Sequence, residues 1–268
     1  MKLVLGYLYP SVMSQYGDCG NVMAIVQRCA WRGIDVEVDS LEVGDQVDPD
    51  RVDLLLVGGG ADSHQRLVYE DLLNVKGDAI RTAVAEGVAA FAVCAGYQLW
   101  GHFYKTANGD ELPGLGVFDA HTIHRAAQTG TALDTIAAAG SVRAVGNLVV
   151  RWGPHLLVGF ENHGGRTYLR DGSKPLGTIV QGGGNNSQDG QEGCVVGNAI
   201  GTYMHGPAFS KNPVLADHLI KAALSRRYGT VDLAPLDDGS EYVAHNRALQ
   251  QAAARPRPWR RWLGDGVG

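Results

Sequence analysis

Apolar residues alternate between strand-like and helix-like spacing over the first hundred residues. Continuous or alternating apolar positions predict strands at residues 2–9, 34–41, 52–60 and 88–94. Helical spacing predicts helices at residues 22–33, at 67–87 in two pieces broken near Gly77, and at 95–104. Continuous apolar strands are typical of a parallel sheet buried on both faces. The repeated strand–helix order therefore predicts an α/β fold with a doubly wound, mostly parallel sheet.

The pattern changes after about residue 112, where strands and loops replace most of the helical segments. A Gly/Asn-rich stretch at 180–193 separates some of these strands, and a last helix is expected at 212–229. We expect the second half to add strands to the first within one domain, residues 1–235. Residues 236–268 are expected to form a C-terminal extension that is partly mobile. Its end, "ARPRPWRRWLGDGVG", is typical either of a solvated terminus or of a docking segment that uses Arg and Trp.

The composition narrows the class of protein. The chain has 268 residues with 45% hydrophobic and 19% charged residues, as in ordinary globular proteins. A net charge of −5 gives no indication of nucleic-acid binding, and no apolar run approaches the ~20 residues of a membrane helix. The four cysteines show no CxxC spacing, which favours free thiols in the cytoplasm and no metal site.

Cys94 lies where a buried strand is expected to turn into a helix. The neighbours in "FAVCAGYQLWG" include the small residues Ala92, Ala95 and Gly96, which a tight strand-to-helix turn requires. This arrangement resembles the nucleophile elbow of hydrolases with Cys in place of Ser. The start of the helix would direct N–H groups toward the thiol, and the N–H of Ala95 would stabilise an oxyanion. A buried structural cysteine is the alternative interpretation.

Two further segments supply candidate partners for a nucleophile. The "GGG" that ends the strand at 52–60 would bring the backbone close to a ligand, so Gly59 and Gly60 are candidate second oxyanion donors. Among the nine histidines, His205 in "GTYMHGP" ends an apolar run and begins a loop. We therefore predict that His205 is the base that acts with Cys94.

These motifs together resemble a known family. "VCAGYQ", the upstream "GGG" and the late "YMHGP" are similar to class I, triad-type glutamine amidotransferases with a flavodoxin-like fold, and more closely to their cobyric-acid-synthase-like branch. "LYPSVMSQYGDCGN", "GGGADSHQ" and "FENHGGRT" add a resemblance to the glutaminase subunits of lipid II isoglutaminyl synthases, and the likeness covers residues 1 to about 225.

The resemblance implies an activity and a partner. Cys94 would hydrolyse L-glutamine through a thioester, with Gln98 and Arg125 holding the substrate and Arg166 as a competitor of Arg125. The ammonia would pass to a Mur-ligase-like synthetase subunit in a heterodimer, which amidates the D-glutamate α-carboxyl of the lipid II stem peptide. The chain has no G-x-x-x-x-G-K-[ST] phosphate loop, so no cofactor is expected here, and ATP and Mg belong to the partner. Membrane contact would be only indirect, through the lipid-linked acceptor.

One part of the family pattern is absent. Many class I enzymes carry a glutamate two residues after the histidine, but this position is Pro207 here. The acid is therefore expected either elsewhere in the chain, with Glu161 as one option, or on the partner subunit. "ENHGGRT" itself fits a packing turn or a partner interface. The alternatives to the main reading are a cobyrinate-type amidotransferase, a Cys-elbow hydrolase or peptidase independent of glutamine, and a regulatory subunit with an inactive site.

Overall fold

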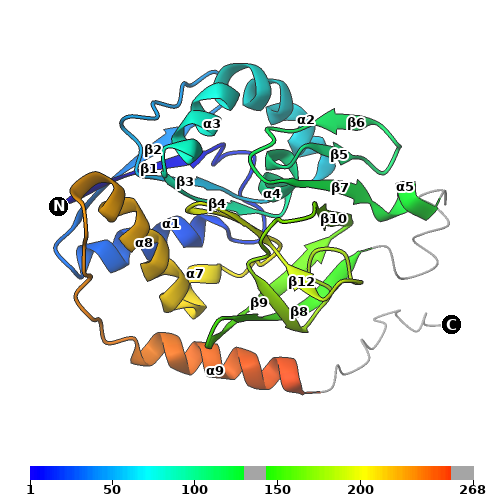
Figure 1. The fold of residues 1–268 in the computed structure, drawn as a ribbon. Coiled ribbons are helices and arrows are strands. Elements are labelled where there is room, and N and C mark those ends of the chain that lie inside the picture. Colours follow the sequence, from blue (N-terminus) through cyan, green and yellow to red (C-terminus); the bar gives the residue numbers. More distant parts are fainter. Residues whose placement is uncertain (130–142, 255–268) are drawn as a thin grey trace, which may run out of the picture.

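A six-stranded sheet forms the centre of the computed structural model, which describes residues 1–129 and 143–254 (Figure 1). The strand order is β13-β14-β4-β3-β1-β2, and all neighbouring strands are parallel except β13 and β14. The bounds are β1 Lys2–Leu8, β2 Asp35–Leu41, β3 Leu54–Val57, β4 Ala89–Val93, β13 Cys194–Val196 and β14 Ala199–Thr202. Strands β3, β4 and β14 are buried throughout, which confirms the mostly parallel, doubly wound sheet predicted from their apolar runs.

Helices cover both faces of this sheet (Figure 1). One face carries α1 (Cys19–Ala30) and α8 (Pro213–Tyr228), with the short α7 (Ala208–Lys211) beside them. The other face carries α2 (Asp62–Asp71), α3 (Gly77–Ala85) and α4 (Ala95–Trp100). The break expected near Gly77 is a five-residue π turn, Leu72–Lys76, rather than a loop. Its Lys76 is fully buried and pairs with Asp71, which also accepts a hydrogen bond from Tyr9 Oη at 2.7 Å.

The second half adds two four-stranded sheets. One has the order β10-β7-β5-β6 and the other β12-β11-β8-β9. The first contains β5 Phe103–Lys105, β6 Glu111–Pro113, β7 Ala120–His124 and β10 Gly165–Leu169, with the short α5 (Arg125–Thr129) after β7. The second contains β8 Ala144–Trp152, β9 His155–His163, β11 Gly177–Gln181 and β12 Gln191–Glu192. The second half of the chain thus consists mainly of strands, as expected from its sequence.

The C-terminal extension includes a helix that the sequence pattern did not predict. Helix α9 (Gly239–Ala253) lies along β8 and β9 (Figure 1), and Ala252 packs against Val149 and Val158. The boundary at residue 235 and the expected mobility stay predictions. The Arg/Trp end of the chain lies outside the described residues, so both of its interpretations stay open. Within the described ranges, no helix is long and apolar enough to cross a membrane.

Candidate active site

Cys94 occupies the sharp turn between β4 and α4. Its backbone has φ 52° and ψ −104°, a conformation that non-glycine residues rarely adopt and that is typical of strained functional turns. The turn requires small neighbours, because a Cβ on Gly96 would lie 2.7 Å from Val57 Cγ1. The structure therefore has the strand–turn–helix geometry predicted for this segment, with Cys94 immediately before the first residue of α4.

His205 lies beside Cys94 because their strands are neighbours. It follows β14, which pairs with β4 in parallel, and the Cys94 N–H donates to Thr202 O at 2.8 Å. A Cβ placed on Gly59 would lie 2.9 Å from His205 Cε1 and 3.2 Å from Cys94 Cβ, so both side chains converge on this glycine. The His205 ring is fully buried, and its Nε2 has no hydrogen-bond partner among the described residues.

Asp18 is the acid that contacts His205. Its Oδ1 lies 3.1 Å from His205 Nδ1, and its Oδ2 accepts a hydrogen bond from the Gly59 N–H at 2.7 Å. Burial disfavours the charged imidazolium, but the interactions with Asp18 and Cys94 outweigh it and raise the pKa of His205 to about 10. Sequence reasoning missed Asp18, although it lies in "QYGDCGN", at the carboxyl end of the sheet where the sites of α/β folds lie.

Glu161 is not the acid that contacts His205. Its carboxylate accepts hydrogen bonds from the N–H groups of Gly183 at 2.6 Å and Gly184 at 2.9 Å. Its nearest histidine contact is His163, whose Nε2 lies 3.5 Å from Glu161 Oε2. The suggestion that Glu161 orients His205 is therefore wrong, because this carboxylate is committed to the 183–184 turn.

The oxyanion donors proposed from sequence differ in their availability. The Gly59 N–H donates to Asp18, so it is not available to an oxyanion, and that assignment is corrected. Ala95 is the first residue of α4, where the backbone N–H has no partner within the helix. Gly60 lines the cavity beside Cys94. Ala95 and Gly60 therefore remain the candidate oxyanion donors, as predicted from the sequence.

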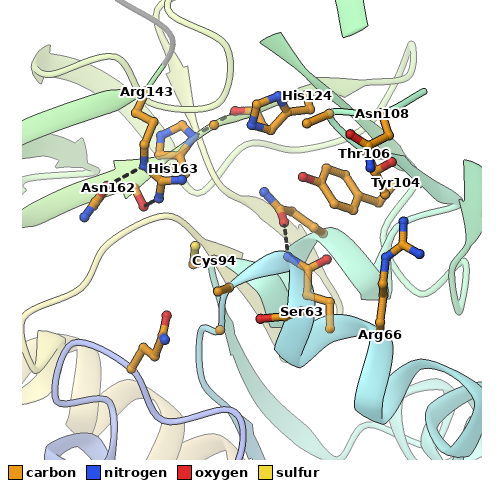
Figure 2. Close-up of a pocket in the computed structure, with 18 of the residues that line it drawn as sticks. Ser63, Arg66, Cys94, Tyr104, Thr106, Asn108, His124, Arg143, Asn162 and His163 are labelled. Atoms are coloured by element: carbon orange, nitrogen blue, oxygen red, sulfur yellow. Dashed lines mark hydrogen bonds between the residues drawn. The ribbon is translucent and has the colours of Figure 1, made fainter. Parts of the chain in front are cut away.

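A cavity of about 630 Å³ opens beside Cys94. Its wall includes polar side chains from both halves of the chain, several of which Figure 2 labels around the thiol. Gln98 lies one helical turn after Cys94, its backbone N–H donates to Cys94 O at 3.0 Å, and it lines the cavity, while its role in holding the substrate stays a prediction. The site is therefore a concave pocket with a thiol and several polar side chains in its wall, as enzyme sites commonly are.

The "ENHGG" segment forms one wall of this cavity. A Cβ on Gly164 would lie 2.2 Å from His124 Nε2, and one on Gly165 would lie 2.4 Å from Gln98 Nε2. Only glycine allows the backbone this close. The ring of His163 stacks on Tyr203 with centroids 3.6 Å apart. The motif thus packs tightly against α4 and lines the cavity, and its proposed role in a partner interface stays a prediction.

The arginines proposed from sequence are not among the residues that line the cavity. Arg125 is nevertheless close, since it follows the cavity residue His124 and its backbone N–H donates to Gly164 O at 3.0 Å. Arg166 is 4% exposed and donates to Gly165 O, and burial lowers its pKa. Two arginines that sequence reasoning did not select, Arg66 and Arg143, do line the cavity. Arg66 pairs with Asp110 at 2.7 Å, and Arg143 donates to Asn162 Oδ1 at 2.9 Å.

The described residues contain no group of three or more His, Cys, Asp or Glu side chains that could hold a metal ion. The chemistry that these residues can perform is acyl transfer, with a thiol nucleophile, a histidine oriented by a carboxylate, and backbone donors for an oxyanion.

Comparison with known proteins identifies the family of this chain. Residues 4–213 match the CobB/CobQ-like glutamine amidotransferase domain. The chain is 34% identical over 230 residues to the lipid II isoglutaminyl synthase (glutamine-hydrolyzing) subunit GatD of Streptococcus pneumoniae, covering 85% of this chain and 83% of that one. It is 32% identical over 252 residues to the subunit of the same name from Staphylococcus aureus, covering 94% and 96%. The chain therefore belongs to the family of CobB/CobQ-like glutamine amidotransferase domains and is a glutamine amidotransferase.

Solved structures show the same fold at low sequence identity. The glutaminase domain of Trypanosoma brucei CTPS, solved with bound acivicin, has a TM-score of 0.53 at 12% identity and covers 87% of this chain and 96% of its own. A structure of PurLQS from Thermotoga maritima has a TM-score of 0.52 at 14% identity and covers 84% and 99%. These likenesses confirm the class I glutamine amidotransferase fold expected from the motifs.

Proposed function

We propose that this chain is the glutaminase subunit of an enzyme that amidates lipid II during peptidoglycan synthesis. It hydrolyses L-glutamine at Cys94 and passes the ammonia to a separate Mur-ligase-like subunit that amidates the D-glutamate α-carboxyl of the stem peptide. The observation that carries the glutaminase assignment is the continuous set Cys94–His205–Asp18 beside a cavity. The lipid-linked acceptor is supported by the names of the two GatD relatives.

The first half-reaction forms the thioester. Cys94 Sγ, which has given its proton to His205 Nε2, attacks the side-chain carbonyl carbon of glutamine as a thiolate, and the carbonyl oxygen becomes an oxyanion held by the Ala95 and Gly60 N–H groups. The C–N bond then breaks, and His205 gives the proton to the departing nitrogen, which leaves as ammonia. Nε2 is suited to this transfer, since Nδ1 is bound to Asp18 and Nε2 has no partner among the described residues.

The second half-reaction releases glutamate. His205 removes a proton from a water molecule, which adds to the thioester carbonyl, and the proton returns to Cys94 Sγ as the C–S bond breaks. Asp18 keeps the ring in one orientation through both steps and stabilises the imidazolium. Because this acid lies in the same chain, the proposal needs no carboxylate from a partner for glutamine hydrolysis.

The fate of the ammonia requires a second subunit. Hydrolysis of glutamine alone yields only glutamate and ammonia, and the chain has no phosphate-loop motif for an ATP-using half. The relatives are called subunits of a synthase, which supports a heterodimer in which the partner carries ATP and Mg. A cytoplasmic location, with membrane contact only through the acceptor, accompanies this proposal as a prediction.

A cobyrinate-type amidotransferase is the second candidate. The chain is 33% identical over 185 residues to the cobyric acid synthase of Pelotomaculum thermopropionicum, but it covers only 33% of that protein. The two GatD relatives are instead covered over 83% and 96% of their length, which favours the separate-subunit function.

A glutamine-to-glutamate assay, with and without the Mur-ligase-like partner, ATP and lipid II, tests the proposal. We expect ammonia release by the wild-type chain, loss of release in Cys94→Ala, and no loss in Cys29→Ala, whose cysteine lies in the core away from the cavity. Amidated lipid II should appear only with the partner. Cleavage of esters or peptides without glutaminase activity would instead identify a Cys-elbow hydrolase.

A further inference from the structure

Two glutamine side chains meet in the cavity wall. Gln65 lies on α2 and Gln98 on α4, and Gln65 Nε2 donates to Gln98 Oε1 at 3.0 Å. Gln98 Nε2 in turn donates to Tyr203 Oη at 3.2 Å. Tyr203 Oη lies 2.7 Å from Thr167 Oγ1, so the two amides belong to one buried hydrogen-bond chain. Because Gln65 Nε2 is bound to Gln98, Gln65 Oε1 lies on the side away from Gln98.

Gln65 Oε1 is a buried acceptor without a donor. Gln65 is 2% exposed and lines the cavity, and its Oε1 has no hydrogen-bond partner among the described residues. Thr106 also lines this cavity, and its Oγ1 is likewise buried with no hydrogen-bond partner among the described residues. Buried polar atoms are nearly always paired, because leaving an acceptor dry and unpaired is costly. A ligand that brings an N–H group into the cavity would remove this cost.

The chemistry of glutamine selects the group that reaches Gln65. The side-chain amide of the substrate must lie at Cys94, and the α-carboxylate can only accept hydrogen bonds. The α-ammonium can only donate and offers three N–H groups. We propose that Gln65 Oε1 binds the α-ammonium group of L-glutamine and thereby selects α-amino acids among primary amides. This inference rests on the proposed glutaminase function and adds a specificity residue to it.

The test compares L-glutamine with two analogues that each lack one α-substituent. Glutaramate lacks the α-ammonium, and 4-aminobutanamide lacks the α-carboxylate. The kcat/KM for ammonia release is measured for all three with the wild type, Gln65→Met and Gln65→Glu, each in the presence of the partner subunit. Met preserves the size of the side chain without its acceptor. Glu preserves the acceptor but has no N–H for Gln98 Oε1, so Gln98 would turn its amide round and donate to the new carboxylate.

The wild type should prefer L-glutamine to glutaramate by a ratio that falls about 10- to 100-fold in Gln65→Met. Gln65→Glu should retain most of that ratio, whereas a merely structural role would lower the rates with both substrates equally. An unchanged ratio in Gln65→Met would overturn the inference. The inference would also be overturned if Gln65→Met lost only the preference for L-glutamine over 4-aminobutanamide, because that result would place Gln65 at the α-carboxylate. Absence of wild-type glutaminase activity would instead overturn the proposed function.

Discussion

The Asp18 carboxylate contacts His205 Nδ1 at 3.1 Å across 187 positions of sequence. The second carboxylate oxygen accepts the Gly59 N–H at 2.7 Å, so Asp18 connects the histidine to the turn that faces Cys94. All three groups are buried, and water therefore competes little for these hydrogen bonds. The acid that the family pattern places two residues after the histidine is here supplied by the loop that follows β1.

Replacement of Asp18 by Asn should lower both glutaminase activity and the pKa of His205. Burial lowers the pKa of the imidazole, and without the carboxylate only the interaction with Cys94 still raises it, so the pKa of His205 should fall from about 10. We expect kcat to fall by roughly 10²- to 10⁴-fold, as for other histidines that lose their orienting acid. Titration of the His205 Cε1–H signal by NMR measures the shift directly. Asp35→Asn, at an exposed aspartate of β2, serves as the matched control. A His205 pKa that stays near 10 in Asp18→Asn would show that another group carries the effect.

Gly59→Ala should separate Cys94 from His205. The new Cβ would lie 2.9 Å from His205 Cε1 and 3.2 Å from Cys94 Cβ, so one of the two side chains must move. We expect kcat to fall at least about tenfold, because small displacements of catalytic groups are costly. Gly146→Ala in β8 is the control, since a Cβ there meets no atom within 4 Å. Equal kcat values for the two variants would contradict the inferred contact.

Glu192 should make the protein less stable as the pH rises. Burial raises the pKa of this carboxyl from 4.5 to about 7, although Thr202 Oγ1 and the Tyr203 N–H donate to it. A raised acid pKa means that the folded state keeps its proton longer, so the free energy of unfolding falls between pH 4.5 and 7. A difference of this size is worth about 3 kcal/mol.

Glu192→Gln removes this titration while keeping the shape of the protonated acid. Relative to the wild type, its free energy of unfolding should increase by about 3 kcal/mol between pH 4.5 and 8. Urea denaturation at the two pH values measures the difference. A wild-type-to-variant difference that does not change with pH would show that Glu192 does not titrate in this range.

Arg125 is the predicted partner of the glutamine α-carboxylate. It follows the cavity residue His124 and its backbone is bound to the cavity wall at Gly164. Arg125→Gln should raise KM for glutamine about tenfold or more with little change in kcat, since a charged hydrogen bond is lost in the ground and transition states alike. Arg66→Gln and Arg143→Gln, which alter guanidinium groups of the cavity wall, are the comparison variants. If KM increases only in one of those two variants, that arginine and not Arg125 binds the α-carboxylate.

The sequence pattern predicted the parts of the site that end buried strands. Cys94 and His205 follow strands β4 and β14, which are rich in apolar residues, and parallel pairing of those strands brings the two residues together. Asp18 could not be recognised this way, because it lies in a loop and its role depends on contacts with residues far along the chain. Pro207, at the usual position of the acid, packs on α1: a Cβ on Gly20 would lie 2.3 Å from Pro207 Cγ.

Other features depended on contacts that no local pattern reveals. The sequence predicted the Gly59 N–H as an oxyanion donor, but in the structure this N–H donates a hydrogen bond to Asp18. The apolar residues of helix α9 are mostly alanines and only Ala252 is buried, so its sequence lacks a strong amphipathic pattern. The unpaired acceptor on Gln65 becomes visible only when α2 and α4 are packed together. Hydrophobic patterning therefore predicts the fold, whereas the site depends on contacts between side chains that are far apart in the sequence.

Covalent labelling by a glutamine-like electrophile tests the central claim most directly. 6-Diazo-5-oxo-L-norleucine reacts with a thiol activated by a neighbouring base, and peptide mass spectrometry identifies the cysteine that carries the adduct. We expect a single adduct on Cys94, formed far more slowly in Asp18→Asn and in a His205→Asn variant. The other three thiols, Cys19, Cys29 and Cys194, lie outside the cavity wall. An adduct on any of these in place of Cys94 would contradict the assignment of Cys94 as the nucleophile.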